Sequence, residues 1–321
     1  MAFAASEAYA PPMLHEVSQA WTGDGELSYR SGAILVAGAG VVFSFTAILF
    51  RGIETASGWQ FLTVRGASAA VAMIVLTLAR SRTRPVSLRG VTITTFVASA
   101  LLTSMAILYI LALARTSTAN VTFLIAAGPL SGALFGRAFL GERLSKVTLT
   151  AMGIAAGGIA VMAFDGLQAD ASTGFILAGF IPAILGLYNM LIRSAPLVDP
   201  VVPTFLATLL LAVVCGVVSL ASGGLAMSLR DVTLGAIAGF VLIGFGLPLF
   251  NLGHRSVPTA QISLLAMTEV VLSPVWVWIW PGETPSGATL VGGTIVIAAV
   301  IWQVTGSTFD ETRSPNNPVA T

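Results

Sequence analysis

The sequence is poor in charge. Charged residues make up 9% of the 321 residues and hydrophobic residues 56%, whereas about a quarter of an ordinary soluble domain is charged. The mean hydropathy is +0.91, and long apolar runs recur with only short breaks, a pattern that requires a bilayer as the solvent. The net charge of +1 provides no basic face for nucleic acid. The composition predicts a single integral membrane domain with no nucleic-acid partner.

Cysteine, histidine and lysine are also scarce. The one cysteine, Cys215, cannot form an internal disulfide, and His15 and His254 are too few and too far apart for a metal cluster. Lys146 is the only lysine and lies outside any glycine-rich phosphate loop. No nucleophile, base and orienting group occur together. The sequence therefore predicts no metal, no cofactor, no catalysis and no use of ATP.

The two ends of the chain are polar. Residues 1–31 contain no Lys or Arg before Arg30, so they lack the basic start and the apolar stretch of a secretory signal. We interpret this segment as a flexible cytoplasmic tail that is not cleaved, and residues 306–321 as a cytoplasmic C-terminal tail.

Ten apolar runs lie between these tails. A helix that crosses a hydrocarbon core of about 30 Å needs about 20 residues, and each run has about that length. The expected spans are, in order, residues 32–50, 59–79, 90–113, 120–140, 144–164, 173–192, 201–221, 232–252, 258–280 and 287–305. The sequence predicts an all-α fold of ten transmembrane helices.

Arginine and lysine are concentrated in alternate loops, which predicts the orientation. The loop after the second run carries four arginines between Arg80 and Arg89. The same side would also hold Arg143, Lys146, Arg193 and Arg255. The opposite loops keep only Arg51, Arg115 and Arg230. Because basic residues of short loops are retained in the cytoplasm, we expect both termini to be cytoplasmic and the protein to lie in a bacterial inner membrane.

The two halves of the chain resemble each other. Arg51 and Arg193 end matching runs and lie 142 positions apart, while Glu142 and Glu283 lie 141 positions apart, each after a glycine. The predicted repeats are residues 32–165 and residues 172–305. Each contains five helices, an odd number, so the second must insert upside down relative to the first. Inverted repeats around a central cavity are the geometry of secondary transporters.

Short motifs recur at matching places in both halves. In the first half they are residues 115–120, Gly128-Pro129 and residues 140–145, and in the second half residues 257–261, Pro274 and Gly282-Glu283. Together they resemble the EamA family of drug/metabolite transporters over residues 32–305. The resemblance implies a ten-helix exporter or exchanger of amino acids or related metabolites that needs no ATP, and YddG-type aromatic amino-acid exporters are the nearest functional group.

Two charged residues lie within predicted spans. Glu269 is near the middle of the ninth, where an ionisable group costs about 3 kcal/mol or more and normally faces a polar cavity. It either couples a proton or pairs with a substrate amine, or else it makes a protonated structural hydrogen bond. Its repeat counterpart is Gly128, so the site would be asymmetric. Arg65, about two turns into the second span, either binds a substrate carboxylate bidentately or extends to the nearer interface.

Further residues within the spans are candidates for the substrate path. The polar and aromatic ones are Tyr109, Tyr188, Asn189, Asn251, Gln261 and Trp276. Facing inward, they would bind amino-acid groups and stack an aromatic ring, whereas the aromatic ones are otherwise packing or interfacial residues. Prolines within the spans either gate the path as helix kinks or are ordinary for membrane helices; they are Pro129, Pro182, Pro248 and Pro274.

These features predict a secondary transporter, monomeric or homodimeric, whose central cavity opens alternately to the two sides of the membrane. It would export amino acids, aromatic ones among them, or related small metabolites. One alternative is a passive channel or facilitator, which would share the helices and the polar interior. Another is a membrane enzyme, which would alter its substrate chemically.

Overall fold

The computed structural model of the protein describes residues 16, 27–80, 91–141, 144, 146–168, 172–194, 201–253, 256–257, 259–280 and 282–312. Within these residues the regular structure is helical and no strand occurs. The fold is therefore all-α, as the sequence predicts.

The helices follow one another with short connections. They are α2 (Tyr29–Arg51), α3 (Gly58–Arg80), α4 (Ile93–Leu113), α5 (Thr118–Ile125), α6 (Gly128–Leu140), α7 (Lys146–Gln168), α8 (Ser172–Ser194), α9 (Val201–Ala221), α10 (Leu229–Ile237), the π-helix η3 (Ala238–Ile243), α11 (Gly246–Gly253), α12 (Thr259–Ile279) and α13 (Gly287–Thr312). Several begin at a hydroxyl residue whose side chain accepts a hydrogen bond from a backbone N–H three positions later, which satisfies one donor that the helix leaves free. These caps are Ser28, Thr92, Ser117 and Ser228.

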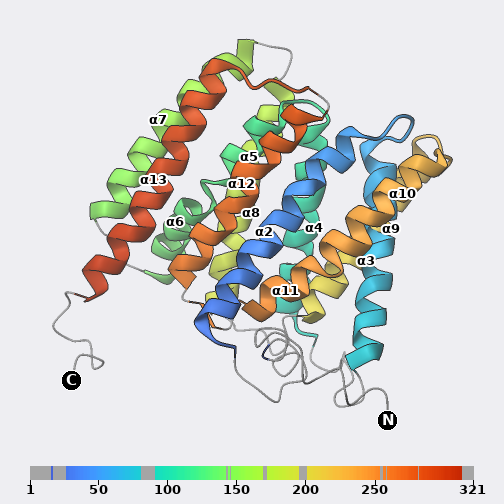
Figure 1. Ribbon diagram of the computed structural model, residues 1–321, viewed down its shortest axis with the longest axis horizontal. Coiled ribbons are helices and arrows are strands. Elements are labelled where there is room, and N and C mark those ends of the chain that lie inside the picture. Colours follow the sequence, from blue (N-terminus) through green and yellow to red (C-terminus); the bar gives the residue numbers. More distant parts are fainter. Residues whose placement is uncertain are drawn as a thin grey trace.

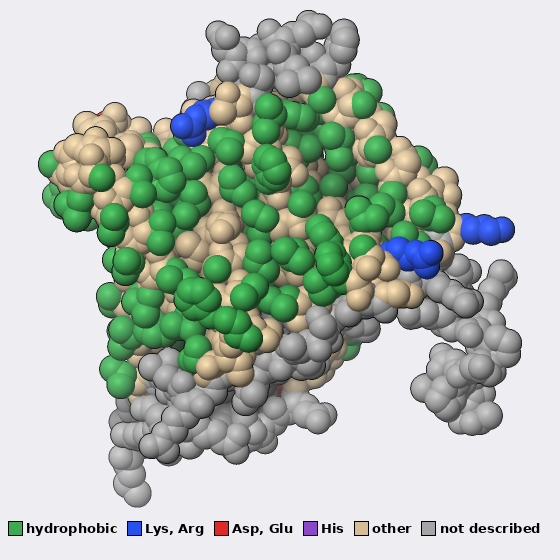
Figure 2. Space-filling view, turned by 180° about the vertical axis from the view of Figure 1, so that it is seen from behind, with side chains coloured by type: hydrophobic (Ala, Val, Ile, Leu, Met, Phe, Trp, Pro, Cys, Tyr) green, Lys and Arg blue, Asp and Glu red, His purple; other side chains and the backbone are tan. Residues whose placement is uncertain are grey.

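Eight segments among the described residues are long and apolar enough to cross a membrane. Two of them combine shorter helices: Thr118–Phe139 covers α5 and α6, and Leu229–Phe250 covers α10, η3 and part of α11. Two further apolar segments, Leu265–Ile279 and Gly287–Trp302, are shorter. Hydrophobic side chains cover the face seen in Figure 2, with Lys and Arg side chains toward its edges. The chain is a multi-pass membrane protein, and the count of ten spans stays a prediction.

The segment expected as a continuous fourth span is broken in the structure. α5 ends at Ile125, and α6 begins at Gly128 with Pro129 in its first turn. Because proline has no N–H and its ring clashes with the preceding turn, it starts a helix more easily than it continues one. The two helices therefore meet at a break about midway along the segment.

The segment expected as the eighth span is also irregular. α10 passes into the π-helix η3, and a turn at residues 244–245 precedes α11, which contains Pro248. In contrast, α8 and α12 continue through Pro182 and Pro274. Proline thus accompanies a helix break in two of the four places and lies inside a continuous helix in the other two.

Helices from the first half of the chain pack mainly against helices from the second half. α2 lies along α12 and α11, α3 along α9, η3 and α10, and α4 along α8 and α9. α6 packs against α8, and α7 against α13, a pair at one edge of the bundle in Figure 1. α5 contacts α8, α12 and α13. One apolar core joins both halves, and its most buried side chains include Phe61, Leu62, Ile110, Leu113, Ile181, Val277 and Val296.

The contact between α7 and α13 depends on two glycines. A Cβ atom at Gly158 would lie 2.7 Å from the Gly292 carbonyl oxygen, and one at Gly292 would overlap the Gly158 carbonyl oxygen. Lipid is as apolar as a leucine side chain, so membrane helices associate through close packing rather than through a hydrophobic driving force. Small residues at this crossing make such packing possible.

Candidate functional site

Four polar side chains from three helices meet inside the bundle. They are Arg65 of α3, Tyr109 of α4, and Glu269 and Ser273 of α12, and we call them the interior polar cluster. Arg65 is 7% exposed, Tyr109 8% and Ser273 0%, whereas Glu269 keeps part of its surface accessible. Arg65, Tyr109 and Glu269 interact electrostatically, and Ser273 lies beside the Tyr109 hydroxyl.

Most polar atoms of the cluster lack a hydrogen-bond partner. Arg65 Nε and Nη1, the Tyr109 hydroxyl and Ser273 Oγ are buried and unpartnered among the described residues. Each unsatisfied buried group costs about 1–3 kcal/mol, and a charged one more. Arg65 is thus buried in the bundle and does not extend to its surface. Acceptor groups of a bound molecule would satisfy these donors, which folding by itself leaves free.

Close backbone contacts hold the arginine in place. A Cβ atom at Gly66 would lie 2.7 Å from the Ala212 amide nitrogen of α9, and one at Gly239 of η3 would overlap the Arg65 carbonyl oxygen. α3 is therefore clamped between α9 and η3 at the turn that carries Arg65. A Cβ atom at Gly40 of α2 would lie 3.4 Å from the Glu269 amide nitrogen of α12. Glycine at these three positions lets the helices approach the cluster from several sides.

Trp276 continues the face of α12 that carries Glu269 and Ser273. Its Nε1 donates to Ser44 Oγ of α2 over 2.8 Å, and its ring stacks on Phe45 with centroids 5.0 Å apart and planes inclined by 14°. Residues at positions i, i+4 and i+7 share one helix face. The indole is thus fixed against α2, one turn beyond the polar cluster.

Tyr188 and Asn189, two other predicted site residues, do not join the cluster. Tyr188 is half-buried and Asn189 is exposed on α8, where Asn189 lies opposite Gly132 of α6. The side chains of Asn251 and Gln261 lie outside the described part of the structure. Several other residues singled out from the sequence also lie outside it, among them His15, Glu142, Arg143, His254 and most of the arginine-rich loop.

A buried carboxylate joins the two halves where α3 and α10 begin. Asp231, in the first turn of α10, is 0% exposed and accepts hydrogen bonds from the backbone N–H groups of Glu54, Thr55 and Ala56, each over 2.9 Å. The Thr55 hydroxyl donates to the same carboxylate over 2.6 Å. Four donors compensate the desolvation of this one charge. The α2–α3 connection is therefore tied to α10, and we call this end of the bundle the 52–57 end.

A second carboxylate makes contacts between halves at the same end. Glu283, in the connection between α12 and α13, pairs with Arg51 Nε over 2.9 Å and accepts hydrogen bonds from the N–H and hydroxyl of Thr118 at the start of α5. Arg51 also donates to the Thr116 carbonyl oxygen over 2.8 Å. A carboxylate at a helix N-terminus is favourable because it meets free N–H groups and the positive end of the dipole. Unlike Asp231, the Arg51 and Glu283 side chains are 25% and 20% exposed.

Sequence reasoning missed Ser273 and Asp231. The position of Ser273 one turn after Glu269 places both on one helix face, which was a usable signal. Asp231 follows Ser228 by three residues, a spacing typical of a helix start, but its partners lie 175 or more positions earlier in the chain. Only the fold could reveal those partners.

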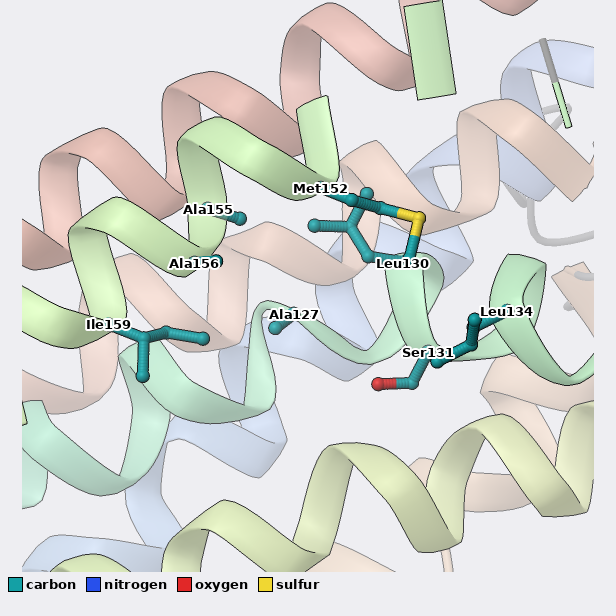
Figure 3. A pocket seen from close by; sticks show the side chains of 8 residues that line it. All are labelled: Ala127, Leu130, Ser131, Leu134, Met152, Ala155, Ala156 and Ile159. Atoms are coloured by element: carbon teal, nitrogen blue, oxygen red, sulfur yellow. The ribbon is translucent and has the colours of Figure 1, made fainter. Parts of the chain in front are cut away.

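An apolar cavity of about 140 Å³ lies between α6 and α7, and no residue of the cluster lines it. Figure 3 shows its lining, in which Ser131 is the one polar side chain. The full set is Ala127, Leu130, Ser131, Leu134, Met152, Ala155, Ala156 and Ile159. This cavity offers packing surface beside the break between α5 and α6 and no charged group, so the polar cluster remains the candidate site.

Comparison with known proteins finds a family match for the first half. Residues 30–164 match the EamA-like transporter family. A curated relative, a "Probable terminal-alkyne amino-acid exporter" of Streptantibioticus cattleyicolor, is 28% identical over 197 residues, which cover 57% of this chain. The chain spans 62% of the length of that relative. The EamA-like match includes Arg65 and Tyr109 of the cluster, whereas Glu269 and Ser273 lie beyond it.

The fold also has a counterpart among solved structures. A chain described as "Crystal structure of protein" superposes with a TM-score of 0.62 at 18% identity, covering 86% of this chain and 98% of its own length. At that identity the likeness concerns the fold alone. It extends over both halves of the chain, beyond the part that matches the EamA-like family.

Proposed function

We propose that this protein is an ATP-independent exporter of amino acids or related small metabolites, aromatic amino acids among them, in a bacterial inner membrane. The observation that carries the proposal is the interior polar cluster, in which a buried arginine has unpartnered donors close to a carboxyl group. Ionisable groups at such depth mark substrate or ion pathways. The EamA-like match and the relative named as an amino-acid exporter support the same function.

We further propose ten spans in two inverted repeats, residues 32–165 and 172–305, that alternate access to the cluster. The pattern of helix pairs supports this. A two-fold duplication relates each span to the one five spans away. The packed pair α2–α12 then corresponds to α8–α6, and the packed pair α4–α8 corresponds to α11–α2. All four of these helix pairs are in contact. The pairs α3–α9 and α7–α13 map onto themselves. This is the contact pattern expected of a two-fold related duplication.

The irregular helices supply places where such a motion can occur. The break before Pro129 and the π-helix and turn before Pro248 leave backbone groups outside regular helix bonding. Within α12, Pro274 has no N–H for the Val270 carbonyl and directly follows Ser273. We assign gating to these three positions and to Pro182 in α8, with both termini on the cytoplasmic side.

Counterflow in proteoliposomes tests the proposal and separates a carrier from a channel. External unlabelled amino acid should drive transient accumulation of the labelled amino acid, which a passive pore does not produce. Arg65→Ala and Arg65→Lys should both reduce this accumulation, Arg65→Ala by about a hundredfold or more, because a charge partner is lost from a buried site. A panel of radiolabelled amino acids, with protein-free liposomes as the control, identifies the substrate. Equilibration without accumulation would support a channel instead.

A further inference from the structure

The unpartnered donors of the cluster come from three different helices. Arg65 of α3 presents Nε and Nη1, Tyr109 of α4 presents its hydroxyl, and Ser273 of α12 presents Oγ. All three side chains are more than nine-tenths buried. Tyr109 links the other two residues, because it interacts with Arg65 and lies beside Ser273. Such a set of donors matches a planar anion, because guanidinium N–H groups and hydroxyls form charge-assisted hydrogen bonds with carboxylate oxygens.

Charge counting restricts the ligand further. Arg65 and Glu269 lie close enough to interact, so the empty cluster carries one cation and one carboxyl group. One more cation among the described residues, Arg51, acts on Tyr109, and its charge is compensated by Glu283. A bound carboxylate by itself would leave one excess negative charge in a buried site, which is costly. A zwitterion adds no net charge, since its ammonium can face Glu269 while its carboxylate faces Arg65.

We propose that Arg65, Tyr109 and Ser273 form a carboxylate subsite, and that Glu269 beside it selects the ammonium group of a zwitterionic substrate. This inference rests on the proposed transport function and deepens it. Ser273 and Tyr109 act as binding residues through their hydroxyls. The site takes a free α-amino acid, and it rejects both the amide of that amino acid, which lacks the carboxylate, and the des-amino acid, which lacks the ammonium.

The variants Ser273→Ala and Tyr109→Phe separate a binding role from a structural one. Each removes a single buried hydroxyl that makes no hydrogen bond of normal geometry among the described residues, although the two hydroxyls lie beside each other. The empty protein should therefore unfold at nearly the same temperature. Binding of an amino acid should weaken by roughly tenfold for each variant, because a hydrogen bond to a charged group is lost. The matched control is Ser99→Ala, a serine equally buried whose Oγ is already bonded to the Thr95 and Pro203 carbonyl oxygens. It should lower stability and leave binding unchanged.

Thermal unfolding of the purified full chain in detergent provides the measurement. L-leucine, L-methionine and L-phenylalanine are each compared with their carboxamide and their des-amino acid, and counterflow is run in parallel. At least one amino acid should raise the unfolding temperature of the native protein while its two analogues do not, and the shift should shrink in Ser273→Ala and Tyr109→Phe. Equal protection by the amides, or hydroxyl variants that bind as the native protein does, would overturn the carboxylate subsite.

The two proposals fail in distinguishable ways. If amino acids show counterflow but their amides raise the unfolding temperature equally, the carboxylate subsite is refuted and the transport function is retained. Absence of both counterflow and protection with all three amino acids refutes the transport function and the subsite together. Lower stability of the empty Ser273→Ala and Tyr109→Phe proteins, with unchanged affinity, assigns the hydroxyls to packing and also overturns the subsite.

Discussion

At the scale of single residues, the interior polar cluster differs from the rest of the bundle interior and is unfavourable for folding. Most side chains inside the bundle are apolar or small, and a buried cation with unpartnered donors lowers stability. The backbone of Arg65 is nevertheless held in place by close contacts at two glycines, Gly66 and Gly239. Proteins retain such unfavourable arrangements mainly at functional sites. The cluster is therefore better explained by a ligand than by folding.

Glu269 provides the residue-scale prediction. Glu269→Gln keeps the size of the side chain but removes the charge that the proposed ammonium group would meet. We expect transport in counterflow to fall by about tenfold or more, because one partner of a buried charge pair is lost, and its dependence on pH to weaken while the protein still accumulates in the membrane. The measurement is initial uptake across a pH series.

The matched control for this change is Glu54→Gln. Glu54 pairs with Arg230, and both side chains are more than half exposed, at 54% and 59%, so the loss of its charge should have little effect. If Glu269→Gln transports like the native protein at every pH, Glu269 has no part in coupling or in substrate binding.

At the scale of elements, the Asp231 carboxylate at the start of α10 contributes more to the joining of helices than single hydroxyl contacts along the bundle. Ser99 and Thr103 of α4 each donate to a carbonyl oxygen of α9 over 3.0 Å, and such contacts between membrane helices average about 0.6 kcal/mol. Asp231 instead accepts four hydrogen bonds with one buried charge. It connects α10 to the segment between α2 and α3, in the other half of the chain.

Asp231→Asn tests this connection. The amide would place N–H donors opposite the N–H groups of residues 54–56, so at least one hydrogen bond must be lost and a donor left unpaired. We expect the protein to lose about 2–4 kcal/mol of stability, measured as unfolding in detergent. Thr233→Ala, on the exposed side of the same helix, should change stability by much less. Equal effects of the two substitutions would contradict the role assigned to Asp231.

At the scale of the whole molecule, the helices at the 52–57 end are joined by contacts that differ in how easily they can break. Asp231 is fully buried, whereas the Arg51–Glu283 pair is partly exposed and so can exchange its partners for water at low cost. A further bond between halves, from Thr289 to Asn120, lies at the same end. In an alternating-access cycle, the contacts of Glu283 are therefore the ones we expect to break when this end opens.

Glu283→Gln should favour the state that is open at the 52–57 end. A cysteine introduced at Thr122, which is 2% exposed and lies one turn inside Thr118, reports the opening in a Cys215→Ala background. We expect a membrane-impermeant thiol reagent to label it several-fold faster with Glu283→Gln, because the variant loses an ion pair and weakens the cap on α5. Glu54→Gln serves as the control on the same end. Identical labelling rates in the two variants would rule out this role for Glu283.

The prediction of the site from the sequence was partial, for physical reasons. Arg65, Tyr109 and Glu269 could be recognised because a polar group within an apolar run is expensive wherever the run folds. Asn189 and Tyr188 satisfy the same criterion, yet α8 places Asn189 on an exposed face. The direction in which a side chain points depends on the neighbours of its helix, and a single run of sequence does not contain those neighbours.

The apolar runs by themselves determined that this chain is a multi-pass, all-helical membrane protein, because an uncharged segment of that length is stable only in lipid and must satisfy its backbone internally. The tertiary structure decided where the helices break, which helices pair, and that Ser273 completes a cluster with Arg65, Tyr109 and Glu269. Those outcomes depend on close contacts between residues far apart in the chain, such as Gly239 against Arg65 and Asp231 against residues 54–56. The hydropathy of a segment therefore predicts that it lies in lipid, whereas the helices against which it packs are known only from the tertiary structure.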